Sequence, residues 1–318
     1  MLPQHLQYPL RRRIPMTAVP ETSIEHLIDG YDALLFDAYG VLVHLRGALP
    51  GAPELIDLLN RIRKPYYLVS NDASKLPETA TARFARFGLQ VTADRIITSG
   101  LLLQHYFSER GLDGVRCAVL GPTDSARYVE LAGGEVVPAD ADFEALVIAD
   151  ETGFSFLETV DTVMTTLFHR IDSGRPVHLI LPNPDIIYPR GEHSFGVAAG
   201  GIALLFEAAL SRRYPNREDL TFTRLGKPQP LLYEQAIRRC GTRSVVMIGD
   251  QLETDIRGAK NCGIDAVLVN TGVSVTDLGQ IDAPLRPTYW MKSVAPRGYV
   301  TQTSEFADID HRQMPAEK

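Results

Sequence analysis

The chain has 318 residues, of which 45% are hydrophobic, so it is long enough for two modules with a sizeable buried core. Its 32 Lys and Arg residues face 39 Asp and Glu residues, and the net charge of -7 argues against a protein that mainly neutralises nucleic-acid phosphates. No apolar stretch approaches the roughly 20 residues that a membrane helix needs. The spacing of Cys117, Cys240 and Cys262 suits neither a metal site nor a disulfide framework. We therefore expect a cytoplasmic protein that binds neither nucleic acid nor membrane.

Short apolar runs alternate with longer amphipathic stretches, which is typical of βα units and a mostly parallel sheet. After an irregular, proline-containing leader over residues 1–20, strands are predicted at Ala33 to Phe36, Tyr66 to Val69, Val115 to Leu120, Ala145 to Ile148, Val177 to Leu181, Ser244 to Ile248 and Ala266 to Val269. Helical spacing of apolar residues predicts helices at Pro53 to Arg61, Pro77 to Phe87, Leu101 to Arg110, Glu158 to Ile171, Gly201 to Ser211, Pro230 to Arg239 and Thr254 to Cys262. The predicted fold class is α/β, with a Rossmann-like doubly wound parallel sheet and a polar tail over residues 296–318.

The first predicted strand ends in Asp37-Ala38-Tyr39-Gly40, so a carboxylate lies at its carboxyl end. Open α/β sheets bind their ligands at this edge. A carboxylate there can attack phosphorus and form an aspartyl-phosphate, which divides a difficult hydrolysis into two easier displacements. The alternative is that Asp37 only caps a turn.

Two further segments supply groups that suit a phosphoryl-transfer site. Ser70 and Asn71 end the second strand, where their side chains and main-chain donors can hold phosphoryl oxygens as charge builds up. Lys227 lies between Gly226 and Pro228, and these small and rigid neighbours can direct its ammonium group toward the negative charge of Asp37. A surface turn is the alternative interpretation of Gly-Lys-Pro.

The segment from Ile248 to Ile256 contains two carboxylates that suit a hard divalent cation. Asp250 follows an apolar strand and Asp255 opens a helix. Magnesium prefers carboxylates together with retained waters and a phosphate oxygen. Asp250 is the better direct ligand, whereas Asp255 binds the metal through water, orients a neighbour, or only stabilises the start of its helix.

These segments, in this order, resemble the motifs of the haloacid dehalogenase (HAD) superfamily of phosphohydrolases. Asp37 and Ser70 are too close in sequence for an inserted domain, whereas the long interval from Ser70 to Lys227 can hold one. That placement, with the segment Asn183-Pro184-Asp185, is similar to the NagD-like subgroup, which has a large α/β cap. The resemblance implies a catalytic core over residues 21–99 and 202–295 and a smaller α/β cap over residues 100–201.

The resemblance also implies a role for each matching residue. Asp37 is the nucleophile, Lys227 balances charge, and Mg²⁺ is bound by Asp37, Asp250, the main-chain carbonyl of Tyr39 and, directly or in support, Asp255. Ser70 and Asn71 bind phosphate. The implied activity is Mg²⁺-dependent hydrolysis of a small phosphorylated metabolite such as a sugar phosphate or a nucleotide.

The cap of this subgroup selects the substrate, which makes Asp185 and Tyr188 candidates for substrate contact. The alternative is that Asn183 to Pro189 is only a rigid turn. Members of the subgroup often pair through their caps, so a homodimer is also expected.

One residue departs from the family pattern. Phosphatases of the superfamily usually carry a second Asp two residues after the nucleophile as general acid and base, and here that position is Tyr39. Loss of such a group costs on the order of 100- to 10,000-fold in rate. A phenol has an unperturbed pKa of about 10, so Tyr39 is a catalytic candidate that can donate a proton to a leaving group but is a poor base for water. Phosphatase activity on good leaving groups is therefore expected. Two alternatives therefore stay open: a weakly catalytic or non-catalytic protein that binds a phosphate ligand, and a 2-haloacid dehalogenase, whose first motif has a Tyr at this position.

Overall fold

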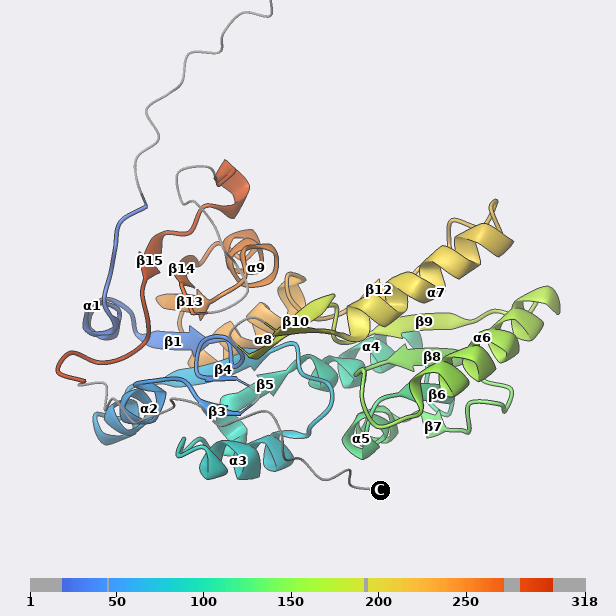
Figure 1. The fold of residues 1–318 in the computed structure, drawn as a ribbon, viewed down its shortest axis with the longest axis horizontal. Coiled ribbons are helices and arrows are strands. Elements are labelled where there is room, and N and C mark those ends of the chain that lie inside the picture. The colour runs from blue at the N-terminus through green and yellow to red at the C-terminus, as the bar shows by residue number, and fades with distance from the viewer. Residues whose placement is uncertain (1–18, 45, 192–193, 272–280, 300–318) are drawn as a thin grey trace, which may run out of the picture.

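The computed structural model describes residues 19–44, 46–191, 194–271 and 281–299. Nearly all of the predicted leader, and residues 300–318 of the predicted tail, lie outside these ranges. The described residues form two separate parallel sheets, each covered by helices, which lie next to each other along the long axis of the molecule (Figure 1). This arrangement confirms the predicted α/β class.

The core sheet has six parallel strands in the order β15-β14-β13-β1-β4-β5. The chain builds one half outward from β1 (Ala33–Phe36) through β4 (Tyr66–Ser70) to β5 (Ile96–Thr98). It then returns to the other side of β1 and adds β13 (Val245–Gly249), β14 (Asp265–Val269) and β15 (Tyr289–Met291). The direction of winding reverses between β1 and β13, and a ligand crevice is expected at such a switch point.

Alternate residues of β1 pack against different layers of helices, which explains why the strand is apolar throughout. Leu34 and Phe36 belong to the cluster on one face, with α1 (Ile24–Gly30), α2 (Ala52–Arg61) and α3 (Pro77–Arg86). Ala33 and Leu35 belong to the cluster that contains α8 (Pro230–Cys240) and α9 (Arg257–Asn261). Because both faces are covered, only the strand ends can present polar groups without burying them among apolar side chains.

The second sheet has five parallel strands in the order β12-β9-β8-β6-β7, and we call this module the cap. Its strands are β6 (Arg116–Leu120), β7 (Glu135–Val136), β8 (Ala145–Ile148), β9 (His178–Leu181) and β12 (Thr223–Arg224). One apolar cluster joins this sheet to α6 (Phe156–Asp172) and α7 (Ala199–Arg213). Residues of α4 (Leu102–Arg110) and α5 (Thr123–Leu131) contribute to a cluster shared with the core. An antiparallel hairpin of β10 (Ile187–Gly191) and β11 (Ser194–Val197) follows β9.

The cap extends further along the chain than the predicted boundary at residue 201. Ile202 and Phe206 of α7 are buried in the cap cluster, and Thr223 of β12 pairs with Ile180 of β9. The core therefore resumes after Arg224, not at residue 202, and this corrects the sequence prediction. The periodicity of α7 predicts a helix correctly, but it does not show which sheet that helix covers.

The predicted strands and helices agree closely with the structure. The structure adds helices α1 and α5 and several short strands, among them β5, β7, β10, β11, β12 and β15. The predicted helix from Thr254 begins as a turn of π-helix, η3 (Leu252–Ile256). The remaining elements are short: β2 (Val43–His44), β3 (Gly47–Ala48), η1 (Ala93–Arg95), η2 (Ser99–Leu101) and η5 (Ala283–Leu285). Among the described residues, none of the helices combines the length and the hydropathy that crossing a bilayer requires.

Candidate active site

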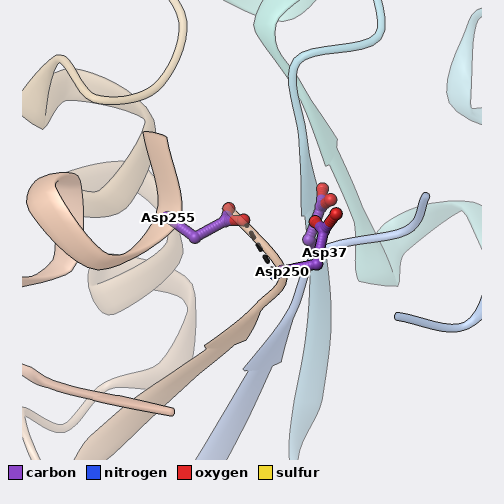
Figure 2. Close-up of side chains that lie close together, drawn as sticks. All are labelled: Asp37, Asp250 and Asp255. Carbon is purple, nitrogen blue, oxygen red and sulfur yellow. Dashed lines mark hydrogen bonds between the residues drawn. The ribbon is translucent and has the colours of Figure 1, made fainter. Parts of the chain in front are cut away.

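The register of β1 and β13 brings two carboxylates together at the switch point. Phe36 pairs with Ile248, and the main-chain N–H of Asp37 donates to the carbonyl of Ile248 over 2.9 Å. Asp250 leaves the sheet beside it, and Asp255 reaches back from η3, as Figure 2 shows. One carboxylate oxygen from each of the three lies within 4.8 Å of the others. Their side chains are almost completely buried, so this cluster must be neutralised by other groups.

Lys227 provides much of that neutralisation. Its Nζ lies 2.7 Å from Oδ1 of Asp37 and 2.7 Å from Oδ1 of Asp255, and the residue is only 2% exposed. Burial alone would lower the pKa of Lys227, but the carboxylates of Asp255 and Asp37 raise it overall, so the ammonium group stays charged. Burial raises the pKa of Asp37 to about 7 although Lys227 opposes this shift. The nucleophile predicted from sequence is therefore held in a desolvated ion pair.

Asp255 organises the loop that carries Asp250. Its Oδ2 accepts hydrogen bonds from the main-chain N–H groups of Asp250, over 3.2 Å, and Gln251, over 3.1 Å. A Cβ on Gly249 would lie 2.2 Å from the Cβ of Asp255, so only glycine fits at the end of β13. These contacts account for a positioning role of Asp255, whereas direct metal binding by this residue stays a prediction.

The side chain of Asn71 joins Lys227 to the cap. Its Oδ1 accepts from the main-chain N–H of Lys227 over 2.7 Å, and its Nδ2 donates to the carbonyl of Lys227 over 3.2 Å. Nδ2 also donates to Oδ1 of Asp185 over 2.8 Å. The amide is thus engaged in holding Lys227 and Asp185, and phosphate binding by Asn71 stays a prediction. Ser70 lies at the edge of the same cleft.

The acidic cluster has the donors that a hard divalent cation requires. Asp37 and Asp250 present carboxylate oxygens side by side, and such oxygens are the preferred protein ligands of Mg²⁺. The chain after the nucleophile comes very close to them, because Gly40 has φ of 80° and a Cβ there would lie 2.4 Å from Oδ2 of Asp250. The residues present therefore fit a metal site. Coordination by the Tyr39 carbonyl stays a prediction.

A cleft of about 170 Å³ opens between the core and the cap above this cluster. The core contributes Asp37, Tyr39, Ser70, Asn71, Asp72, Ser74, Lys75, Arg83 and Gln251, and the cap contributes Asp150, Glu151, Thr152, Asn183, Asp185, Tyr188 and Ala198. Both predicted substrate-contact residues thus line the cleft.

Sequence analysis did not identify Asp150 and Glu151 as candidates. These residues follow the predicted strand β8 after Ala149, so the rule about carboxyl ends of strands that found Asp37 would also have found them.

Tyr39 is held in a position that favours its neutral form. The guanidinium of Arg83 lies 5.2 Å from the centre of its ring. Burial raises the pKa of Tyr39 to about 12, and the nearby charge of Arg83 only partly offsets this shift. At neutral pH the phenol is therefore protonated and does not act as a base toward water.

Comparison with known proteins places these motifs in a family. Residues 34–135 match a model described as haloacid dehalogenase-like hydrolase, and residues 224–296 match a second, HAD-hydrolase-like model. A solved structure described as a "possible sugar phosphatase, HAD superfamily" from Cytophaga hutchinsonii is 30% identical, with a TM-score of 0.76, and covers 87% of this chain and 99% of its own. The chain belongs to the haloacid dehalogenase superfamily. The predicted family and its NagD-like subgroup are thereby confirmed.

Two further relatives are phosphatases. The dihydroxyacetone phosphatase of Corynebacterium glutamicum is 28% identical to this chain over 264 residues. The alignment covers 82% of this chain and 88% of the Corynebacterium protein. The structure of a glycerol phosphate phosphatase from Mycobacterium tuberculosis in complex with magnesium shares the fold, with 23% identity and a TM-score of 0.69, over 84% of this chain and 77% of its own. The comparisons thus identify a hydrolase of the HAD type.

Proposed function

We propose that the protein is a phosphoric monoester hydrolase that removes phosphate from a small phosphorylated metabolite with the help of Mg²⁺. The observation that carries this proposal is the buried ion pair of Asp37 with Lys227, at the sheet edge where Asp250 also emerges. A carboxylate that is desolvated and held by a cation is positioned to attack an electrophile at that edge. The phosphatase relatives support the same reaction class.

In the proposed reaction Asp37 attacks the phosphorus atom, and the bond from phosphorus to the leaving oxygen breaks. The resulting aspartyl-phosphate is then hydrolysed by water. Lys227 stabilises the negative charge that gathers around Asp37, and Ser70 lies where its hydroxyl can donate to a phosphoryl oxygen. Mg²⁺, when bound by Asp37, Asp250 and the carbonyl of Tyr39, would neutralise charge on the phosphoryl group.

The cleft favours a small substrate. Its volume of about 170 Å³ suits a metabolite, and its cap wall carries the polar groups of Asp185 and Tyr188, which we propose as substrate contacts. A sugar phosphate or triose phosphate is the substrate class that the named relatives favour. A homodimer through the cap and a cytoplasmic location stay predictions from the sequence.

The deciding experiment is phosphate release from p-nitrophenyl phosphate and from a panel of sugar and triose phosphates, with Mg²⁺ or with a chelator, beside the variant Asp37→Asn. Metal-dependent release that the variant loses would support the proposal. No release at any Mg²⁺ concentration would contradict it and favour the phosphate-binding alternative, for which Tyr39 is the supporting observation.

A dehalogenase is disfavoured because Asp250 and Asp255 would repel a carboxylate substrate, and halide release from short 2-halo acids would test it.

A further inference from the structure

The core wall of the cleft carries a cation that the proposed reaction does not use. Arg83 belongs to α3 and lines the cleft together with Asp37 and Tyr39. Its guanidinium carbon lies 5.2 Å from the centre of the Tyr39 ring and 5.4 Å from the centre of the Phe87 ring. The residue is only partly buried, so two aromatic rings hold a guanidinium group that the cleft can still reach.

Arg83 forms no ion pair with an Asp or Glu side chain among the residues that the structure describes. The neighbouring Tyr39 does not balance its charge, because burial raises the pKa of that phenol to about 12 and keeps it neutral. Lys75, on the same wall, is engaged differently: its Nζ donates to the hydroxyl of Ser74 over 2.7 Å and lies 3.9 Å from Oδ2 of Asp72. A cation that is partly withdrawn from water without a counter-ion is unfavourable, and an anion on a bound ligand would remove that cost.

We propose that Arg83 binds a second anionic group of the substrate, either a carboxylate or a further phosphate, on the part of the molecule that is not transferred. The proposal rests on the proposed phosphatase function, because it narrows the substrate class of the same site. The N–H groups of a planar guanidinium match the two oxygens of a carboxylate or phosphate. Since the rings of Tyr39 and Phe87 already hold that plane, little conformational freedom is lost when the anion binds.

The distribution of charge in the cleft places this anionic group on the core side. The acidic residues Asp150, Glu151 and Asp185 line the cap wall, and no Lys or Arg among the described residues lines it. An anion on the substrate is repelled by the cap wall and attracted to Arg83. Hydroxyl groups donate hydrogen bonds and therefore suit the carboxylates of the cap. A phosphorylated hydroxy acid or a sugar bisphosphate combines both kinds of group.

The test compares two pairs of substrates whose members differ in one anionic group. Glycerol 3-phosphate is paired with 3-phosphoglycerate, which has an added carboxylate, and fructose 6-phosphate is paired with fructose 1,6-bisphosphate, which has an added phosphate. We expect the wild-type protein to have the higher kcat/KM for the more anionic member of at least one pair, and that pair identifies the anion that Arg83 binds. Equal values, or higher values for the less anionic member, in both pairs overturn the proposal.

The variant Arg83→Gln removes the cation and keeps a polar side chain. We expect kcat/KM for the preferred anionic substrate to fall on the order of 10- to 100-fold, as loss of hydrogen bonds to a charged group predicts, and for its less anionic partner to fall less than about 3-fold. The loss should lie in KM with kcat nearly unchanged, because the contact is made equally in the ground state and the transition state. The matched control Arg86→Gln, at the exposed end of the same helix, should change neither value.

The variant Arg83→Lys separates anion binding from mere support of the Tyr39 ring. Lysine keeps the charge but lacks the planar fork, so it should retain more of the preference for the anionic substrate than glutamine does. A structural defect at Tyr39 would instead lower kcat for every substrate. Equal losses for both members of the preferred pair therefore overturn the role of Arg83 while leaving the phosphatase function intact. Absence of phosphate release by the wild-type protein from all four substrates and from p-nitrophenyl phosphate overturns both proposals.

Discussion

Replacement of Lys227 by Met tests whether this residue neutralises the buried carboxylates. The substitution keeps an unbranched side chain of similar length but removes the cation that lies 2.7 Å from both Asp37 and Asp255. We expect loss of phosphate release and a marked loss of stability, because two buried anions then face each other without their common partner.

The magnitude follows from burial and from pH. Removal of one partner of a buried ion pair costs about 3–5 kcal/mol, and all three groups here are buried. Asp37 already has a pKa raised to about 7 while Lys227 opposes that shift, so its pKa must rise further without the cation. A carboxyl with a raised folded-state pKa stabilises the fold below its unfolded pKa, and that contribution is lost as pH rises through the folded value. The cost should therefore be near its full size at pH 8 and smaller by up to about 1.4 kcal/mol at pH 5, where Asp37 is protonated.

Urea unfolding in the presence of a chelator measures this cost. The single tryptophan, Trp290, lies in β15 of the core sheet, so its fluorescence reports on the module that contains Lys227. Lys292→Met is the matched control, since its side chain is 79% exposed and it should change the free energy of unfolding by less than about 0.5 kcal/mol. Equal stability of Lys227→Met and the wild type at pH 8 would refute the electrostatic reasoning.

Three further substitutions test the same cluster. Asp37→Asn should abolish phosphate release yet make the metal-free protein more stable at pH 8 by about 1 kcal/mol or more, because a buried carboxylate is replaced by a neutral amide; a less stable variant in urea unfolding would contradict this. Gly40→Ala should cost at least about 1 kcal/mol and weaken Mg²⁺ binding by calorimetry, since φ is 80° and the new Cβ would meet Asp250; unchanged binding would argue against a tight metal loop. Asp250→Asn should remove the stabilisation of about 2.7 kcal/mol that the wild type gains at Mg²⁺ concentrations 100 times Kd, and persistent stabilisation by Mg²⁺ would exclude Asp250 as a ligand.

The core of the site could be predicted because one simple rule of α/β folds governs it. Asp37 and Asp250 each follow a fully apolar strand, and parallel strands end at the same edge of a sheet. The sequence positions of these residues are far apart, but the pairing of β1 with β13 makes them neighbours. Lys227 was less predictable, since Gly226-Lys227-Pro228 also describes an ordinary turn and only the burial of its side chain distinguishes the two.

The cap was predicted less completely because its packing depends on surfaces that sequence periodicity does not identify. Helix α7 has helical spacing whether it covers the core or the cap, and the structure shows that Phe206 packs in the cap. Strand β12 is too short to give a signal of its own, and it is recognised only by its pairing with β9. The end of the cap therefore falls after Arg224 instead of at residue 201.

Asn71 and Asp185 show how the two modules share one site. Asn71 follows the core strand β4, Asp185 follows the cap strand β9, and the hydrogen bond between their side chains crosses the boundary between core and cap. The same amide holds the main chain of Lys227, whose ammonium pairs with Asp37. The negative charge of Asp185 also raises the pKa of Asp37. The cap in this arrangement therefore bears on the electrostatics of the nucleophile as well as on access to the cleft.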